Sequence, residues 1–148
     1  MIEIRRATID DIPLILALVK ELALYEKAPH EVTATLLDYK ACGFSDHPLF
    51  YSNLAFYEGK LAGFALWYFR FSTWKGKRFY LEDLYVKDEF RGKGIGKQLI
   101  ETCIDEAKNT NCTGMMWQVL DWNTPAIEFY KQYHATFDGE WLNVNLNL

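Results

Sequence analysis

Hydrophobic and polar residues at the start of the chain follow first an alternating and then a helical spacing. Ile2-Glu3-Ile4-Arg5 alternates apolar and polar residues, which predicts a short strand. Thr8 is a suitable cap for a following helix. The apolar face of that helix is made of Ile12, Ile15, Leu16, Val19, Leu22 and Ala23. A second, short helix is expected from a cap at Thr33 to Cys42, with Gly43 ending it.

The middle of the chain changes to an extended pattern. Strands are expected over residues 49–57, 61–71 and 80–86, with a tight turn at Glu58-Gly59-Lys60 between the first and the second. Short strands that follow one another through turns pair side by side. The pattern therefore predicts an antiparallel meander.

Helical spacing returns after this meander. Residues 94–109 predict a helix, 115–120 a strand, 124–133 a short helix, and the alternating tail 140–148 a final strand. The order β-α-α-β-β-β-α-β-α-β indicates an α/β fold with a mixed, mostly antiparallel central sheet and flanking helices. No linker or repeat interrupts the 148 residues, so residues 1–148 are expected to form a single domain.

Composition and charge exclude several classes of protein. Sixteen basic and twenty acidic residues give a net charge of −4, which argues against a nucleic-acid partner. The three cysteines and three histidines show no ligand spacing, so neither a disulfide framework nor a metal site is expected. The first residues have no apolar signal segment and no apolar run is long enough to cross a bilayer, which predicts a cytoplasmic protein without a membrane partner.

A glycine-rich turn lies between the third predicted strand of the meander and the next helix. Its sequence is Arg91-Gly92-Lys93-Gly94-Ile95-Gly96-Lys97. Glycines allow backbone N–H groups to approach a ligand, and the helix N-terminus favours an anion, so the turn suits a phosphate or pyrophosphate. The spacing matches neither a P-loop nor a dinucleotide fingerprint, because three residues separate Gly92 from Gly96 and Lys97 lies three residues after Gly94.

This turn, following Tyr80-Leu81-Glu82-Asp83-Leu84-Tyr85-Val86, resembles the acyl-CoA loop of the GCN5-related N-acetyltransferase (GNAT) superfamily. The order of elements resembles that fold as well, over almost the whole chain. Trp74-Lys75-Gly76 and Leu120-Asp121-Trp122-Asn123 are similar to the diamine/polyamine branch, and above all to its thialysine N-epsilon-acetyltransferase members.

The resemblance implies acetyl-CoA as co-substrate and assigns residues to it. The pyrophosphate would be held by the loop residues Arg91, Gly92, Lys93, Gly94, Ile95, Gly96 and Lys97. The pantetheine arm would pair with the backbone of Leu84, Tyr85 and Val86, and would be flanked by Asn123, Thr124, Pro125 and Ala126. Tyr130 matches the tyrosine that protonates the departing sulfur, and Glu82 the base that deprotonates the amine directly or through a water.

The resemblance also implies a small cationic amine as acceptor. The residues that match or lie near acceptor contacts are Tyr25, Glu26, Trp74, Glu82, Asp83, Met116, Trp117, Gln118 and Glu140. Trp117 is equally compatible with a core position. Glu82 and Asp83 are neighbours on a strand, so strict alternation would allow only one of them to face a given cleft. His134 is expected at the end of a helix on the surface, and not as a base.

Alternatives remain for the activity. A diamine or polyamine could replace a thialysine-type acceptor, although the positive charge of Lys27 beside Glu26 suits a long polycation less well. Acetylation of a protein amine and a non-catalytic acyl-CoA-binding module are the other possibilities. No cysteine has the setting of a nucleophile, which favours direct attack in a ternary complex. The apolar tail and the family similarity predict a homodimer.

Overall fold

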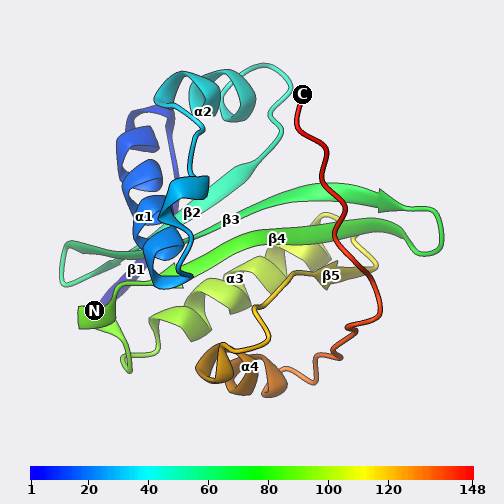
Figure 1. Cartoon of the computed structure of the whole chain (residues 1–148). Helices are drawn as coiled ribbons and strands as arrows, with labels where there is room; N and C mark the ends of the chain where they lie inside the picture. Colours follow the sequence, from blue (N-terminus) through cyan, green and yellow to red (C-terminus); the bar gives the residue numbers. More distant parts are fainter. The chain divides into compact units, whose positions relative to one another are not determined.

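A computed structural model describes all 148 residues of the chain. The contacts within it divide the chain into two compact units, residues 1–117 and residues 118–148. The first unit contains a sheet and three α-helices (Figure 1). The second contains one short helix followed by an extended tail.

The elements of the first unit follow the predicted order. In chain order they are β1 (Ile2–Arg6), α1 (Ile12–Tyr25), α2 (Leu36–Gly43), β2 (Tyr51–Tyr57), β3 (Lys60–Ser72), β4 (Gly76–Val86), α3 (Ile95–Asn109) and β5 (Gly114–Met116), with short 3₁₀ turns at Ile9–Asp11, Pro29–Glu31 and Asp88–Phe90. The sheet has five strands in the order β1-β2-β3-β4-β5. The pairs from β1 to β4 are antiparallel, whereas β5 is parallel to β4 and reaches it through the crossover helix α3.

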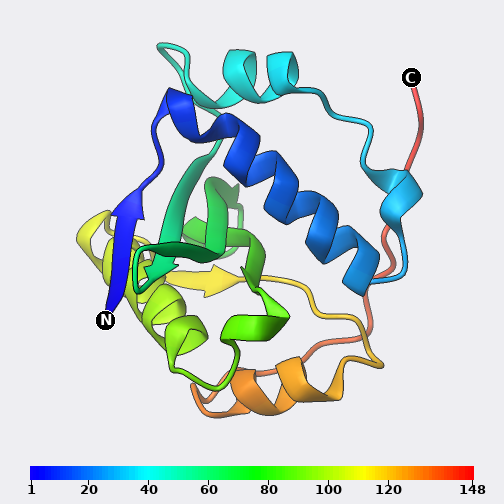
Figure 2. The same cartoon turned by 90° about the vertical axis from the view of Figure 1, so that its left-hand side faces the viewer.

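The two faces of this sheet are covered by different helices. Helix α1 covers one face (Figure 2). Its residues Ile15, Leu18 and Leu22 pack against Phe64 and Leu66 of β3. On the other face, α3 packs against the sheet through Ile95, Leu99, Cys103 and Ala107, with Trp67, Phe79 and Leu81 beneath them. Apolar residues at helical spacing on α1 and α3 and at alternate positions of β3 explain both contacts.

An ion pair between the exposed Arg5 and the buried Asp11 joins β1 to the start of α1. The guanidinium of Arg5 donates to both carboxylate oxygens of Asp11, at 2.7 and 3.0 Å. The hydrogen bond from Arg5 lowers the pKa of Asp11 to about 2, with smaller contributions from Thr8. The pair therefore stays intact throughout the neutral range and fixes the angle at which the chain enters α1.

Several sequence predictions need correction at the ends of elements. The cap of α2 is Thr35 and not Thr33, because Thr35 and Asp38 form a capping box in which the Asp38 N–H donates to the Thr35 hydroxyl. Strand β5 is limited to Gly114–Met116, shorter than the predicted 115–120, and α4 (Thr124–Lys131) ends two residues earlier than predicted.

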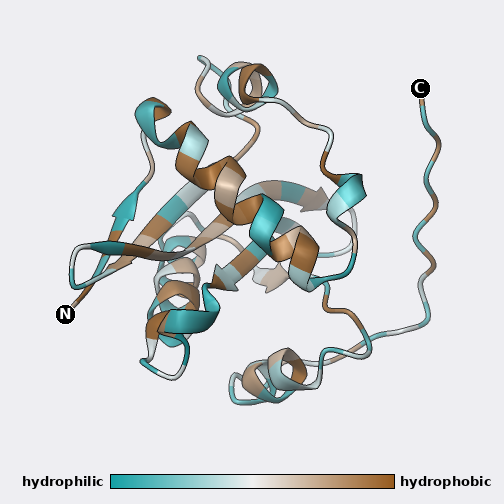
Figure 3. Cartoon of the chain, turned by 60° about the vertical axis from the view of Figure 1, so that its left-hand side comes forward, coloured by the Kyte–Doolittle hydropathy of each residue, from teal (hydrophilic) through white to brown (hydrophobic).

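The predicted final strand over 140–148 was wrong for the single chain. Its residues are extended but belong to no sheet, and Figure 3 shows the tail alternating between hydrophilic and hydrophobic residues. Val144 is 91% exposed and Leu146 84%. A strand is stabilised by hydrogen bonds to a neighbouring strand, and no strand pairs with this segment.

Candidate active site

The glycine-rich loop lies between β4 and α3, as the sequence predicts, and is separated from β4 by the 3₁₀ turn Asp88–Phe90. Gly92 and Gly94 adopt left-handed φ angles of +76° and +83°, which side-chain-bearing residues rarely adopt. Gly94 is the N-cap of α3, no side chain caps this helix, and its first turn contains no acidic residue. The first backbone N–H groups of α3 therefore form a positively polarised end that suits an anionic group such as a pyrophosphate.

The three cations of the loop have different surroundings. The Arg91 guanidinium donates from Nε to the carbonyl oxygen of Val86 at 3.1 Å and pairs with Asp88 at 2.9 Å. It also lies over the ring of Tyr25, 4.9 Å from the ring centre. Lys93 lies 5.1 Å from the ring centre of Tyr57, whereas Lys97 is exposed on the first turn of α3. Arg91 thus fixes the loop against β4 and α1.

The end of β4 has a free edge next to this loop. Strand β5 pairs with β4 only over Arg78–Tyr80, so Leu84, Tyr85 and Val86 pair with β3 on one side and with no strand on the other. Such an edge can accept an extended ligand through backbone hydrogen bonds. The Val86 carbonyl is already bound by Arg91, so an incoming arm would find its free acceptors and donors at the residues before it.

Two adjacent carboxylates lie on β4 just before this edge. Leu66 of β3 pairs with Asp83 and Trp67 pairs with Leu81, so Glu82 is the extra residue of a β-bulge. The expectation that strict alternation separates Glu82 from Asp83 therefore fails here. Burial, together with the negative charges of Glu82 and Glu26, raises the pKa of Asp83 to about 7. Burial also raises the pKa of Glu26.

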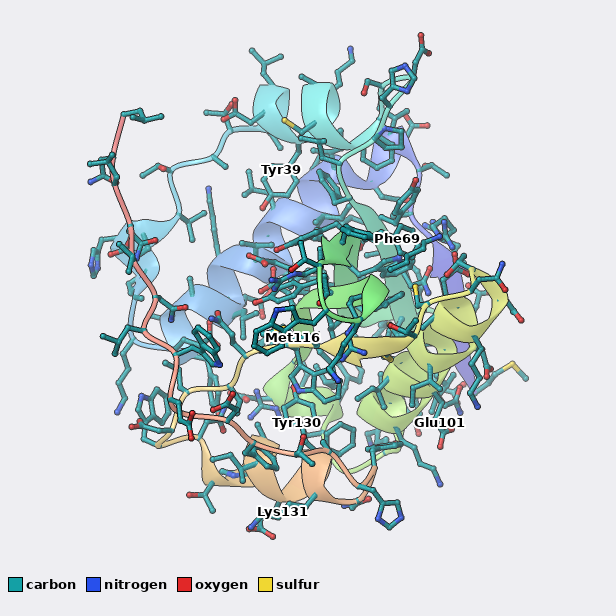
Figure 4. The ribbon with its side chains drawn as sticks, turned by 90° about the vertical axis from the view of Figure 1, so that its right-hand side faces the viewer. Tyr39, Phe69, Glu101, Met116, Tyr130 and Lys131 are labelled. Carbon is teal, nitrogen blue, oxygen red and sulfur yellow. The ribbon has the colours of Figure 1, made fainter.

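Three tyrosines that the sequence analysis did not select surround these carboxylates. The charges of Asp83 and Glu82 add to burial in raising the pKa of Tyr39 from α2. Glu82 likewise raises the pKa values of Tyr68 and Tyr80, whose rings stack with centres 5.0 Å apart. Figure 4 labels Tyr39 beneath α2. Tyr68 and Tyr80 share one face of adjacent strands, which strand alternation could have indicated, but only the packing of α2 brings Tyr39 to them.

The remaining predicted acceptor residues of the first unit are spread along the sheet. Tyr25 ends α1 and Glu26 follows it directly, whereas Trp74 lies in the β3–β4 turn and is 82% exposed. That turn is separated from Glu82 by most of β4. Met116 (labelled in Figure 4) ends β5. It pairs with Tyr80 of β4, and the half-buried Trp117 packs against the α3 face of the core. The core alternative for Trp117 thus has direct support.

The second unit contains the other candidates. Asn123 caps α4, with its side-chain oxygen accepting from the Ala126 N–H at 3.4 Å, and Pro125 occupies the first turn beside Thr124. Tyr130 is buried and its ring contacts Phe129 edge to face. The Gln118 amide donates to Asn143 at 2.9 Å, and Glu140 is exposed on the tail. His134 follows α4 at a left-handed φ of +58°, where helices often end on a glycine.

The chain contains no cluster of metal ligands, and its buried cysteine is not set up as a nucleophile. No group of three or more His, Cys, Asp and Glu side chains could hold a metal ion. All three cysteines are free, and burial raises the pKa of Cys103 to about 12, so this thiol stays protonated. No helix has the length and apolar character needed to cross a membrane.

Comparisons with known proteins agree with this arrangement. The chain is 39% identical over 140 residues to thialysine N-epsilon-acetyltransferase of Bos taurus, covering 89% of this chain and 82% of that protein. It is 39% identical over 135 residues to spermidine/spermine N(1)-acetyltransferase-like protein 1 of Homo sapiens, covering 86% of this chain but 19% of that protein. An aminoglycoside N-acetyltransferase solved in complex with CoA has the same fold, with a TM-score of 0.80 and 22% identity. The match covers 100% of this chain and 96% of that one.

A family profile connects the loop, the strand before it and the helices to one activity. The acetyltransferase (GNAT) family matches residues 15–135, which include most of α1, the carboxylates of β4, the glycine-rich loop and Tyr130. The site has an uncapped helix end that suits an anion and a strand edge beside two carboxylates. Together with the comparisons, this shows that the chain belongs to the acetyltransferase (GNAT) family and is an N-acetyltransferase.

Proposed function

We propose that this protein transfers the acetyl group of acetyl-CoA to a small primary amine of the thialysine or lysine-analogue type, by direct attack in a ternary complex. One observation carries the proposal. Strand β4 places two carboxylates, Glu82 and Asp83, immediately before a free strand edge and the uncapped end of α3. A cationic acceptor and an anionic co-substrate would thus meet at one strand.

The residues present fit acetyl-CoA. The N–H groups at the start of α3 and the side chains of Lys93 and Lys97 suit the pyrophosphate, and Arg91 holds the loop in place. The free edge at Leu84–Val86 suits the pantetheine arm, and its N–H groups could stabilise negative charge on the thioester oxygen. In the second unit, Asn123 is the N-cap of α4 and Thr124, Pro125 and Ala126 form its first turn; the family resemblance assigns these four residues to the arm.

Two proton transfers need groups from the chain. An alkylammonium with a pKa of ~10 is protonated at neutral pH and must lose a proton before it attacks. Glu82 would accept this proton directly or through a water. Asp83 is the second candidate, because a pKa raised to about 7 suits a base that works at neutral pH. Tyr130 would protonate the departing thiolate from its phenol.

The acceptor would be recognised by charge and by aromatic rings. Glu26, Glu82 and Asp83 supply negative charge, and Tyr39, Tyr68 and Tyr80 surround it, which suits an ammonium on an aliphatic stem. A diamine or polyamine is the alternative acceptor, supported by the spermidine/spermine name of one relative. A non-catalytic acyl-CoA-binding module is the alternative of another class.

We also propose a homodimer in the cytoplasm. The alternating apolar residues of the tail would form a strand on a second copy of the chain, and free cysteines suit a reducing compartment. Sedimentation at micromolar concentration tests the assembly. A dimer that becomes monomeric after Val144→Asp and Leu146→Asp is expected, and a monomeric wild type would contradict it.

Release of CoA thiol tests the activity. Wild-type protein with acetyl-CoA should release thiol in the presence of thialysine, and more slowly with spermidine. Release with spermidine alone would favour the polyamine alternative. No release with any small amine, together with binding of acetyl-CoA by calorimetry, would favour the binding module.

A further inference from the structure

One face of the β3–β4 pair carries a graded series of charges. Opposite residues on this face are Leu66 and Asp83, then Tyr68 and Tyr80, then Arg70 and Arg78. Side chains two residues apart on β3 point to the same side, and the extra residue Glu82 in β4 keeps Asp83 opposite Leu66, so the three pairs form consecutive rows. The series runs from carboxylate through phenol to guanidinium.

The last row places two positive charges directly opposite each other. Arg70 and Arg78 are register partners, and like charges in this position destabilise a sheet. The Arg78 guanidinium donates to the Met115 carbonyl at 3.3 Å and lies over Gly114, where a Cβ atom would be 2.3 Å from its Nη1 atom. Arg70 is exposed, donates to the Met116 sulfur at 3.4 Å and forms no ion pair. An unneutralised pair of guanidinium groups suits a carboxylate.

The arginine row lies within reach of the carboxylates. Arg70 and Asp83 are separated by two rows, about 13 Å at ~3.3 Å per residue. The Arg70 guanidinium lies over the ring of Tyr80, 5.5 Å from its centre, and thus leans back toward the acidic row. Burial raises the pKa values of Tyr68 and Tyr80; the charge of Glu82 raises them as well, and the charge of Arg70 lowers both.

An amino acid with an amine at the end of its side chain has matching charges. Its terminal ammonium and its carboxylate carbon are separated by six bonds in lysine, roughly 7–8 Å when extended. Flexible arginine and aspartate side chains would span the rest of the distance between the rows. A polyamine has no anion to place beside the arginines and would bring a second ammonium toward them.

We propose that Arg70, with Arg78 beside it, binds the carboxylate of an amino-acid acceptor and so selects such acceptors over diamines. This inference rests on the proposed function and specifies the acceptor at the same site. The stem of the acceptor would lie over the stacked rings of Tyr68 and Tyr80, with its reacting amine at Asp83 and Glu82. Arg70 is then a specificity-determining residue, although it lies far from the proton-transfer groups.

A matched pair of acceptors tests the role of Arg70. Thialysine and the diamine formed by removing its carboxyl group differ only in the charge that Arg70 would bind. In Arg70→Gln, kcat/KM for thialysine should fall by at least about tenfold, mainly through KM, because a charge-assisted hydrogen bond is lost. The kcat/KM of this variant for the diamine should equal or exceed the wild-type value. Arg70→Lys should restore part of the preference.

Lys77 provides a matched control. It is a cation on the other face of β4, where its ammonium lies 4.5 Å from the ring centre of Phe69. Lys77→Gln should leave the preference for thialysine at its wild-type value. Equal losses for both acceptors in Arg70→Gln would show a packing role only and would overturn the inference, as would an unchanged preference. Wild-type protein that acetylates neither acceptor would instead contradict the proposed function itself.

Discussion

The ring of Tyr25 lies under the guanidinium of Arg91, with the Arg91 Cζ atom 4.9 Å from the ring centre. Tyr25 is the last residue of α1, and Arg91 begins the glycine-rich loop. The same helix reaches the end of β4 a second time, because Glu21 pairs with Lys87 at 3.5 Å. Helix α1, which ends just before Glu26, therefore contacts the glycine-rich loop through Arg91 and the residue after β4 through Lys87.

Removing the ring of Tyr25 should loosen the loop. In Tyr25→Leu, we expect the KM for acetyl-CoA to rise about two- to fivefold, which corresponds to the loss of one cation–π contact. Tyr25→Phe keeps the aromatic face and should retain a KM close to wild type. Steady-state kinetics with varied acetyl-CoA checks both variants. An equal rise in KM for Tyr25→Phe would assign the effect to the hydroxyl group.

The left-handed conformation of Gly94 predicts a separable effect on stability and binding. Gly94→Ala should lower the free energy of unfolding by about 1 kcal/mol, because alanine is strained at a φ of +83°. It should also weaken acetyl-CoA binding, since the N–H groups at the start of α3 would shift. Gly59→Ala, at a φ of +78° in the β2–β3 turn, should cost similar stability without affecting binding. Calorimetry on both variants measures their stability and their affinity for acetyl-CoA. If the two variants bind acetyl-CoA equally well, the loop does not contribute to the binding site.

The raised pKa of Asp83 predicts opposite effects on activity and stability. In the wild type, kcat/KM should fall as the pH decreases below about 7, because Asp83 becomes protonated and cannot act as a base. In Asp83→Asn this limb of the pH profile should disappear together with most of the activity. If the limb persists in Asp83→Asn and is lost in Glu82→Gln, Glu82 is the base.

The same substitution should stabilise the fold at high pH. The pKa of Asp83 rises from 3.8 to about 7 on folding, so the folded chain binds more protons than the unfolded chain between these values. Stability due to this group is therefore complete below pH ~4 and is lost as the pH rises through ~7. Thermal unfolding should show a higher Tm for Asp83→Asn than for wild type at pH 8, and a much smaller difference at pH 5.

The phenol of Tyr130 should affect turnover more than binding. Tyr130→Phe removes the proposed proton donor and keeps the buried ring, so kcat should fall by at least about tenfold while CoA binding persists. Tyr133 is the matched control, since its ring also contacts Phe129, at 5.6 Å between centres. Tyr133→Phe should retain kcat within about twofold. A wild-type kcat in Tyr130→Phe would reject the acid role.

The sequence by itself determined most of the elements, because their hydrophobic periods are local. Helices α1 and α3, the three-strand meander and the glycine loop follow from spacing and from residue types that fit one backbone conformation. The family and its enzymatic activity were also identified from motifs that are contiguous in the chain, and the comparisons confirm them.

Only the tertiary structure decided which charges act on one another. The bulge that makes Glu82 an extra residue of β4 depends on pairing with β3, and Tyr39 reaches Asp83 because α2 packs on the α1 face. The opposition of Arg70 and Arg78 likewise depends on strand register. The tail alternates like a strand but pairs with none, since a strand requires hydrogen bonds from outside its own segment. Local sequence fixes periodicity, whereas register, desolvation and charge coupling arise between segments that are distant in the chain.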